Sequence, residues 1–146
     1  MNRIITAFLI IWQFPQYLTS LVSIIFISIE RIEKIGQCKV HYTNKFQRFG
    51  ISFGSNILLS NDNRGQELLP HEYGHSIQSL ITGPFYLVLI AIPSIFRFIF
   101  YQKKINKAKS DQEKETLRNQ YFLGYPENWA TSLGKKYFPQ RNKQDA

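Results

Sequence analysis

The stretch His71-Glu72-Tyr73-Gly74-His75 follows the HExxH pattern, in which two histidines stand four residues apart. Positions i and i+4 share one face of a helix, so His71 and His75 can bind one metal ion together. Glu72 then points to the flank, where it can reach a metal-bound water. The stretch predicts a zinc site on a helix. The competing interpretation is a histidine pair satisfied by hydrogen bonds or water.

The residues around this stretch predict an α+β, mostly helical fold in a single domain over 1–146. Apolar residues set among polar ones over 39–60 predict two short strands. A helix is expected from about Gln66 to Leu80. Pro70 should lie in its first turn, because a proline inside a helix removes a hydrogen bond. The motif would then lie near the start of the helix.

The N-terminal segment carries no charge from Ile4 to Ile29, a length that can cross a bilayer at about 1.5 Å per residue. Trp12, Gln13 and Pro15 interrupt it, so a kinked helix in the membrane interface competes with a transmembrane helix. A cleaved signal peptide is a third interpretation, which the lack of a small-x-small site disfavours. We therefore expect 4–29 to be a membrane anchor.

The net charge of +8 is concentrated after Gln102, where ten Lys/Arg against five acidic residues contribute +5. The first lysines of this region follow directly on the apolar segment 85–101, and the last residues, 135–146, form a basic tail. This position favours membrane lipid at the cytoplasmic side as a partner, and no nucleic-acid partner is expected. The single cysteine, Cys38, excludes an internal disulfide.

A catalytic zinc ion usually takes three protein ligands and keeps one position for water, so two histidines are insufficient. The candidates for the third ligand are His41, Asp62, Glu67 and Glu127. Glu127 lies in a predicted short helix that begins with Pro126 and closes with Gly134. Taken alone, a carboxylate of this kind is more often a surface charge than a ligand.

Glu127-Asn128-Trp129-Ala130-Thr131 resembles the ExxxD motif that accompanies HExxH in the gluzincins, the thermolysin-like zinc peptidases. In that resemblance His71, His75 and Glu127 are the zinc ligands and Glu72 is the general base. The chain departs from the family at Thr131, where the gluzincins have an Asp that steadies the first histidine. A hydroxyl lacks the charge that raises ligand basicity, so metal affinity could be about ten- to a hundredfold lower.

Most of the chain is also similar to a group of small bacterial membrane-associated proteins with a shared set of landmarks. These landmarks are Trp12-Gln13-Phe14-Pro15-Gln16, Gly50-Ile51-Ser52-Phe53-Gly54, the stretch 71–79, Gly83-Pro84-Phe85-Tyr86-Leu87, and Glu127-Asn128-Trp129-Ala130 with Leu133-Gly134. The similarity implies a minimal zincin-like core over 39–134 and a place at the bacterial inner membrane.

The resemblance also constrains the apolar segment before Gln102. If 77–101 crossed the bilayer as one straight helix, Glu127 would emerge on the opposite face from His71 and His75. We therefore expect an apolar hairpin over 84–101, broken at Pro84 and Pro93, that returns to the same side.

The expected function is a membrane-associated zinc metallohydrolase, most plausibly a peptidase acting on a peptide or protein substrate. Glu72 would take a proton from a zinc-bound water, and Tyr42, Tyr121 or Tyr125 could serve as the oxyanion donor. The alternative is a non-catalytic membrane protein. In it, the HExxH site is a structural metal site or a hydrogen-bonded clamp between helices 66–80 and 126–134.

Overall fold

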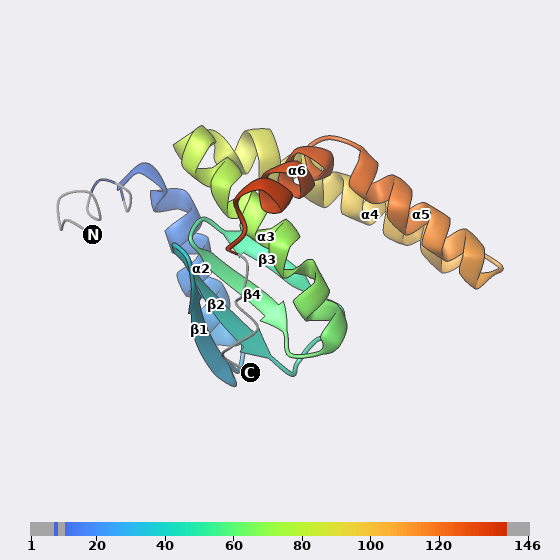
Figure 1. The fold of residues 1–146 in the computed structure, drawn as a ribbon, viewed down its shortest axis with the longest axis horizontal. Helices are drawn as coiled ribbons and strands as arrows, with labels where there is room; N and C mark the ends of the chain where they lie inside the picture. The colour runs from blue at the N-terminus through green and yellow to red at the C-terminus, as the bar shows by residue number, and fades with distance from the viewer. Residues whose placement is uncertain (1–7, 9–10, 140–146) are drawn as a thin grey trace.

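A small mixed β-sheet with helices around it forms the body of the protein (Figure 1). The computed structural model describes residue 8 and residues 11–139. The strands of this part are β1 (Arg31–Ile35), β2 (Cys38–Thr43), β3 (Gly50–Phe53) and β4 (Asn56–Ser60), in the order β1-β2-β4-β3. β2 and β4 are parallel, and the other two pairs are antiparallel. β3 is therefore an edge strand.

The helices of the described part are α2 (Phe14–Phe26), α3 (Asn63–Thr82), the 3-10 turn η1 (Gly83–Phe85), the π-helical segment η2 (Leu87–Ala91), α4 (Ile92–Lys107), α5 (Asp111–Leu123) and α6 (Glu127–Tyr137). The expected α+β, mostly helical class is confirmed. The two strands expected over 39–60 are in fact three, and β1 was not expected. The Gly36 turn, with φ +56°, joins β1 to β2.

The hydrophobic core lies between the sheet and α3. Its buried side chains are Ile35, Cys38, Val40, Tyr42, Ile57, Leu59, Leu69 and Tyr73. Burial raises the pKa of the Cys38 thiol to about 11. The core therefore fixes the face of α3 that meets the sheet.

Helix α3 begins earlier than the sequence indicated, because Asp62 caps it. The Asp62 carboxylate accepts hydrogen bonds from the backbone N–H of Gly65 at 2.5 Å and of Arg48 at 2.9 Å. Pro70 consequently lies inside the helix, so its expected place in the first turn was wrong. The carbonyl that loses its partner belongs to Gln66, an exposed residue where water can replace the missing N–H.

Helices α3 and α6 cross at two glycines. A side chain on Gly74 would meet the Ala130 carbonyl, and one on Gly134 would meet the Pro70 carbonyl. The two backbones are therefore in direct contact, which places the first turns of α6 against the HExxH face of α3.

Of the two predicted breaks in the apolar hairpin, the structure shows the one at Pro84, and the one at Pro93 was wrong. Helix α3 ends at Thr82, and Gly83, with φ +54°, begins the separate 3-10 turn η1. At Pro93, by contrast, η2 runs directly into α4, and the chain next turns between α4 and α5, at 108–110. The carbonyl of Leu89, four residues before Pro93, would lack a donor, but the Tyr125 hydroxyl donates to it at 2.7 Å. The helical course can therefore continue through Pro93.

The expected membrane anchor lies partly outside the described residues, since 4–7 and 9–10 are not among them. Within the described part of the chain, no helix combines the length and the apolar character that a membrane crossing needs. Of the basic tail over 135–146, the structure describes 135–139, which complete α6 and follow it.

Candidate metal centre

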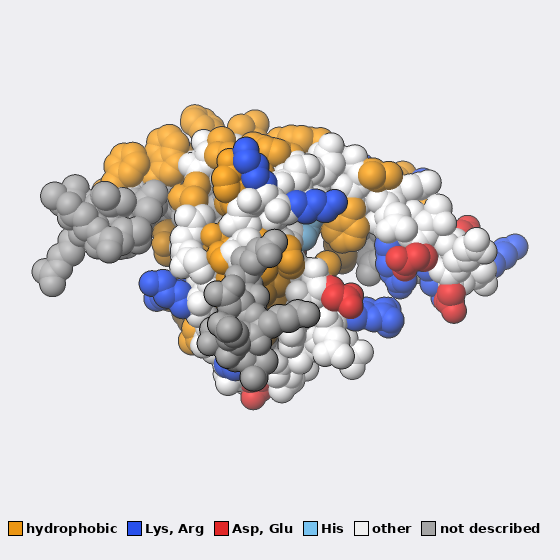
Figure 2. Space-filling view, in the orientation of Figure 1, with side chains coloured by type: hydrophobic (Ala, Val, Ile, Leu, Met, Phe, Trp, Pro, Cys, Tyr) orange, Lys and Arg blue, Asp and Glu red, His pale blue; other side chains and the backbone are white. Residues whose placement is uncertain are grey.

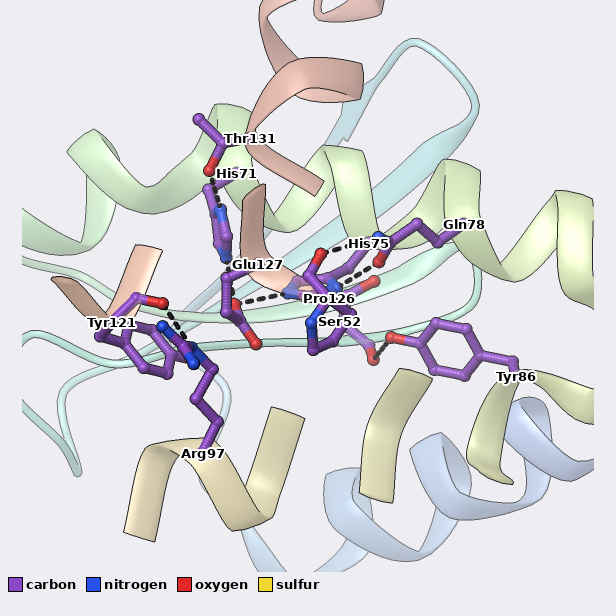
Figure 3. Close-up of polar contacts among 10 residues, drawn as sticks. All are labelled: Ser52, His71, His75, Gln78, Tyr86, Arg97, Tyr121, Pro126, Glu127 and Thr131. Carbon is purple, nitrogen blue, oxygen red and sulfur yellow. Dashed lines mark hydrogen bonds and ion pairs between the residues drawn. The ribbon is translucent and has the colours of Figure 1, made fainter. Parts of the chain in front are cut away.

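Three predicted ligands converge between α3 and α6 (Figure 3). Nε2 of His71 lies 3.0 Å from Oε2 of Glu127, and Nε2 of His75 lies 3.2 Å from the same oxygen. One ligand atom from each residue lies within 4.8 Å of the other two. The structure thus brings Glu127 together with His71 and His75, which precede it by 56 and 52 positions in the sequence.

The other ring nitrogen of each histidine has its own partner. Nδ1 of His71 lies 3.0 Å from the Thr131 hydroxyl, and Nδ1 of His75 lies 2.7 Å from Oε1 of Gln78. The Gln78 amide in turn donates to the Pro126 carbonyl at 3.0 Å. These contacts hold both rings with Nε2 directed at Glu127, as the hydrogen-bond partners of metal-binding histidines do.

Glu127 is fully buried, with 0% of its surface exposed. Burial by itself would raise the pKa of its carboxyl, but the hydrogen bonds and charges of His71 and His75 outweigh burial and lower it. Its Oε1 atom is buried and makes no hydrogen bond of ordinary geometry among the described residues, although the Ser94 and Tyr121 hydroxyls lie near the carboxylate. A buried carboxylate with an oxygen that is not fully satisfied fits a metal ligand better than a surface charge.

Glu72 lies beside this cluster on the face of α3 that meets β3. A side chain on Gly50 would come within 2.9 Å of the Glu72 carboxyl, so the glycine that begins β3 makes room for it. Glu72 is buried, and burial raises the pKa of its carboxyl above the usual range. A raised pKa brings a carboxyl closer to the value that suits a general base near neutral pH.

The remaining third-ligand candidates lie elsewhere. His41 pairs with Asn56 at 3.3 Å between β2 and β4, and Glu67 is exposed on the first turns of α3. Asp62 caps α3. Glu127 alone of the four joins the histidines.

Among the expected oxyanion donors, two tyrosines have other partners. The Tyr42 hydroxyl donates to Glu33, and the Tyr125 hydroxyl donates to Leu89. Tyr121 lies next to the site, where its hydroxyl is close enough to Glu127 for the carboxylate to raise the tyrosine pKa, after the larger effect of burial. Of the three tyrosines, Tyr121 is the one that lies close enough to the site to be the oxyanion donor.

The donor set fits a small, borderline-soft divalent cation. Two imidazoles and one carboxylate are a common protein ligand set for zinc, and ligands about 2.0–2.1 Å from a tetrahedral ion stand about 3.3 Å apart. The observed separations of 3.0 and 3.2 Å to Glu127 are close to that value. The cluster can therefore hold a metal ion, and the donor chemistry does not by itself distinguish zinc from its neighbours in the transition series.

Comparisons with known proteins give no relative. No family model, no curated protein and no solved structure matches the chain. The candidate metal site is therefore supported by the geometry of its residues.

Two residues that matter for the site were missed in the sequence. Gln78 stands three positions after His75, on the same helix face, so its spacing could have indicated a partner for the imidazole. In the sequence, Gly50 is recognisable only as the first residue of the landmark 50–54. Gly50 contacts Glu72, and no short sequence pattern indicates that the start of β3 packs against α3 at this point.

Metal affinity is expected to fall as the pH falls. Burial would lower the pKa of His75, but the Glu127 and Glu72 carboxylates outweigh burial and raise it. Below that raised pKa the imidazole must lose a proton before it can bind a metal, so affinity should fall by about tenfold per pH unit. Titration calorimetry with Zn²⁺ in buffers of different ionisation enthalpy measures this proton release. An affinity that stays constant from about pH 8 to about pH 5 would contradict it.

Proposed function

We propose that this protein is a metal-dependent hydrolase, specifically a zinc peptidase associated with a membrane. The observation that carries the proposal is the convergence of His71, His75 and Glu127, with the buried Glu72 carboxyl beside them. The proposed core is a minimal zincin-like arrangement of α3, α6 and the sheet edge. The motifs HExxH and ExxxT supply the residues for it.

A zinc ion bound here would supply Lewis acidity that lowers the pKa of a water and polarises a carbonyl. The chain's own residues would do the rest. Glu72 would accept the proton of the attacking water and pass it to the leaving amine. Thr131 and Gln78 would keep both imidazoles oriented, and the Tyr121 hydroxyl would donate to the developing oxyanion.

A peptide substrate is favoured by the position of β3. This strand is at the edge of the sheet, and its first residue, Gly50, lies against Glu72. Edge strands bind extended peptides through backbone hydrogen bonds. The Ser52 carbonyl of this strand already accepts a hydrogen bond from the Tyr86 hydroxyl at 3.4 Å, so a bound peptide would have to displace Tyr86 there. A bound peptide would run beside the proposed base.

Membrane association at the cytoplasmic side of a bacterial inner membrane is part of the proposal. Large apolar side chains are exposed on α2, η2 and α4, and lysines follow them at the end of α4.

Hydrolysis can be tested on protein purified in detergent and loaded with one equivalent of Zn²⁺. We expect new peptide termini in a peptide library, detected by mass spectrometry. A chelator should abolish them and added Zn²⁺ should restore them. If bound metal is confirmed and neither the library peptides nor a membrane-inserted peptide is cut, the hydrolase proposal fails.

The second candidate is a structural site that clamps α3 to α6. The observation that favours it is that both imidazoles already have hydrogen-bonding partners at each nitrogen, including the shared Glu127 oxygen. In this case metal binding, or the hydrogen bonds alone, would stabilise the fold without catalysis. The same experiment separates the two candidates.

Replacing Thr131 by Asp is expected to raise metal affinity by about ten- to a hundredfold. The new carboxylate would stand where the hydroxyl now lies 3.0 Å from Nδ1 of His71, and a charged partner raises the basicity of the imidazole. Competition with a chelating dye measures the change. Thr131→Val, which keeps the shape and loses the hydroxyl, should lower affinity instead. Equal affinities in all three proteins would exclude this contact from metal binding.

A further inference from the structure

Helix α2 has its polar and apolar faces reversed relative to a helix of a water-soluble domain. Its protein-facing side carries the fully buried Gln16 and the buried Ser20, and Gln13 just before the helix is buried as well. Its outward side carries Phe14, Leu18, Leu21, Val22, Ile25 and Phe26, each with at least half of its surface exposed. A surface helix in water normally shows the opposite pattern.

The reversed pattern continues on the segment that follows α3. The Trp12 indole donates to the Leu80 carbonyl at 2.9 Å, and the Gln16 amide donates to the Gly83 carbonyl at 2.6 Å, so α2 is fixed to this segment. Exposed apolar side chains then recur at helical spacing along η1, η2 and α4. They are Phe85, Val88, Leu89, Ile92, Ile95, Phe96 and Ile99, here called the apolar stripe. Figure 2 shows hydrophobic side chains along the upper edge of the molecule, over the end of α3 and the segment after it.

The charged residues next to the apolar stripe indicate that the stripe contacts lipid. Lys103, Lys104 and Lys107 are exposed and follow it on the same helix, and the Lys104 ammonium lies 4.4 Å from the centre of the Phe100 ring. Apolar side chains that pass directly into lysines match the boundary between acyl chains and anionic headgroups.

The inner side of the same helix meets the candidate metal centre. The Ser94 hydroxyl lies near the Glu127 carboxylate. Arg97 donates to the carbonyls of Tyr121 at 2.7 Å and Gln120 at 2.6 Å, and Figure 3 shows Arg97 and Tyr121 beside Glu127. Ser94 and Arg97 alternate with Ile95, Phe96 and Ile99 of the stripe. One helix, about 10–12 Å across, therefore separates the metal ligands from the lipid-facing surface.

The metal ligands are nearly closed to bulk water. The side chains of His71 and His75 are only 10% and 8% exposed, and Glu127 is not exposed at all. The Phe122 ring packs edge-on against His71 at 4.9 Å between centres. A substrate must therefore displace part of this cover, which includes Phe122 of α5 and, near Glu127, Ser94 of the lipid-facing helix α4.

We infer that the metal centre acts on polypeptides held in the bilayer, cutting them within or next to an apolar segment that enters past η2 and α4. This inference rests on the proposed hydrolase and names its substrate class.

The position of the apolar stripe can be tested with nitroxide labels on the full chain, reconstituted into vesicles of neutral and anionic phospholipid. Labels at Phe96→Cys and Ile92→Cys should be more accessible to oxygen than to an aqueous nickel chelate. A label at Ile32→Cys, an equally exposed apolar position on β1, should show the reverse. Cys38 is buried and is replaced by Ser in all variants. Preferential nickel accessibility at Phe96, or protection from both reagents as in a protein interface, would overturn the inference.

The substrate class can be tested with two probes and the same zinc-loaded protein in vesicles. One probe is a dye-labelled peptide with an apolar Leu/Ala segment inserted in the vesicles, and the other is soluble dye-labelled casein. We expect the inserted peptide to be cut at least tenfold faster, at bonds within or adjoining the apolar segment. Casein cut at an equal or greater rate would overturn the inference and leave the hydrolase intact. No cleavage of either probe, nor of the peptide library, would overturn both.

Discussion

Replacing Glu72 by Gln is expected to slow hydrolysis by about 10²- to 10⁴-fold and to leave the metal bound. The amide has the size of the carboxyl and can occupy the space that Gly50 leaves, but it cannot accept a proton from water. The proposed metal ligands His71, His75 and Glu127 are untouched. Turnover of library peptides and metal content, measured on the same preparation, report the two effects separately.

Glu67→Gln is the matched control for that variant, because it makes the same chemical change at an exposed position of the same helix. Its activity should equal that of the wild type. Turnover retained in the Glu72 variant would remove this carboxyl from the role of base. Loss of both turnover and metal would instead assign Glu72 to the ligand shell.

Replacing Glu127 by Gln is expected to lower metal affinity by more than about 100-fold. Outer partners of metal ligands typically account for about ten- to a hundredfold, and the loss of a charged ligand itself should exceed that. Oε2 of Glu127 is the atom that both histidines face, and the neighbouring Glu72 carboxyl is not part of this group of ligand atoms. Competition with a chelating dye and circular dichroism distinguish a lost ligand from a lost fold.

Glu115→Gln, at an exposed carboxylate of α5, is the control for the Glu127 variant. It should bind metal as the wild type does. If the Glu127 variant bound metal with unchanged affinity, the cluster would be a hydrogen-bonded clamp rather than a metal site.

Local patterns in the sequence were sufficient for the fold class and for the helices around HExxH and Glu127. They failed where a distant group satisfies a backbone atom. Pro93 looked like a break because the Tyr125 hydroxyl that donates to the freed Leu89 carbonyl lies 36 positions away along the chain. β1 was missed because Arg31-Ile32-Glu33-Lys34-Ile35 carries three charges and forms a strand only through its pairing with β2.

The candidate site was predictable to different degrees. The spacing of His71 and His75 indicated directly that both can bind one metal ion. Glu127 was selected from four candidates because the segment 127–131 resembles the ExxxD motif. The contact of Thr131 with His71 agrees with that reading. Gln78 and Gly50 act through contacts that depend on how α3 meets α6 and β3, and such packing is not encoded in any short pattern.

Because α3 and α6 pack directly against each other at Gly74 and Gly134, metal binding is coupled to the packing of these two helices. Two ligands come from one helix and the third from the other, so an ion bound by all three selects the docked state. By mass action, free metal at about 100 times its dissociation constant would stabilise that state by about 2.7 kcal/mol. The lifetime of the folded chain in the cell would then follow the supply of free metal, and starvation for that metal would remove the protein as well as its activity.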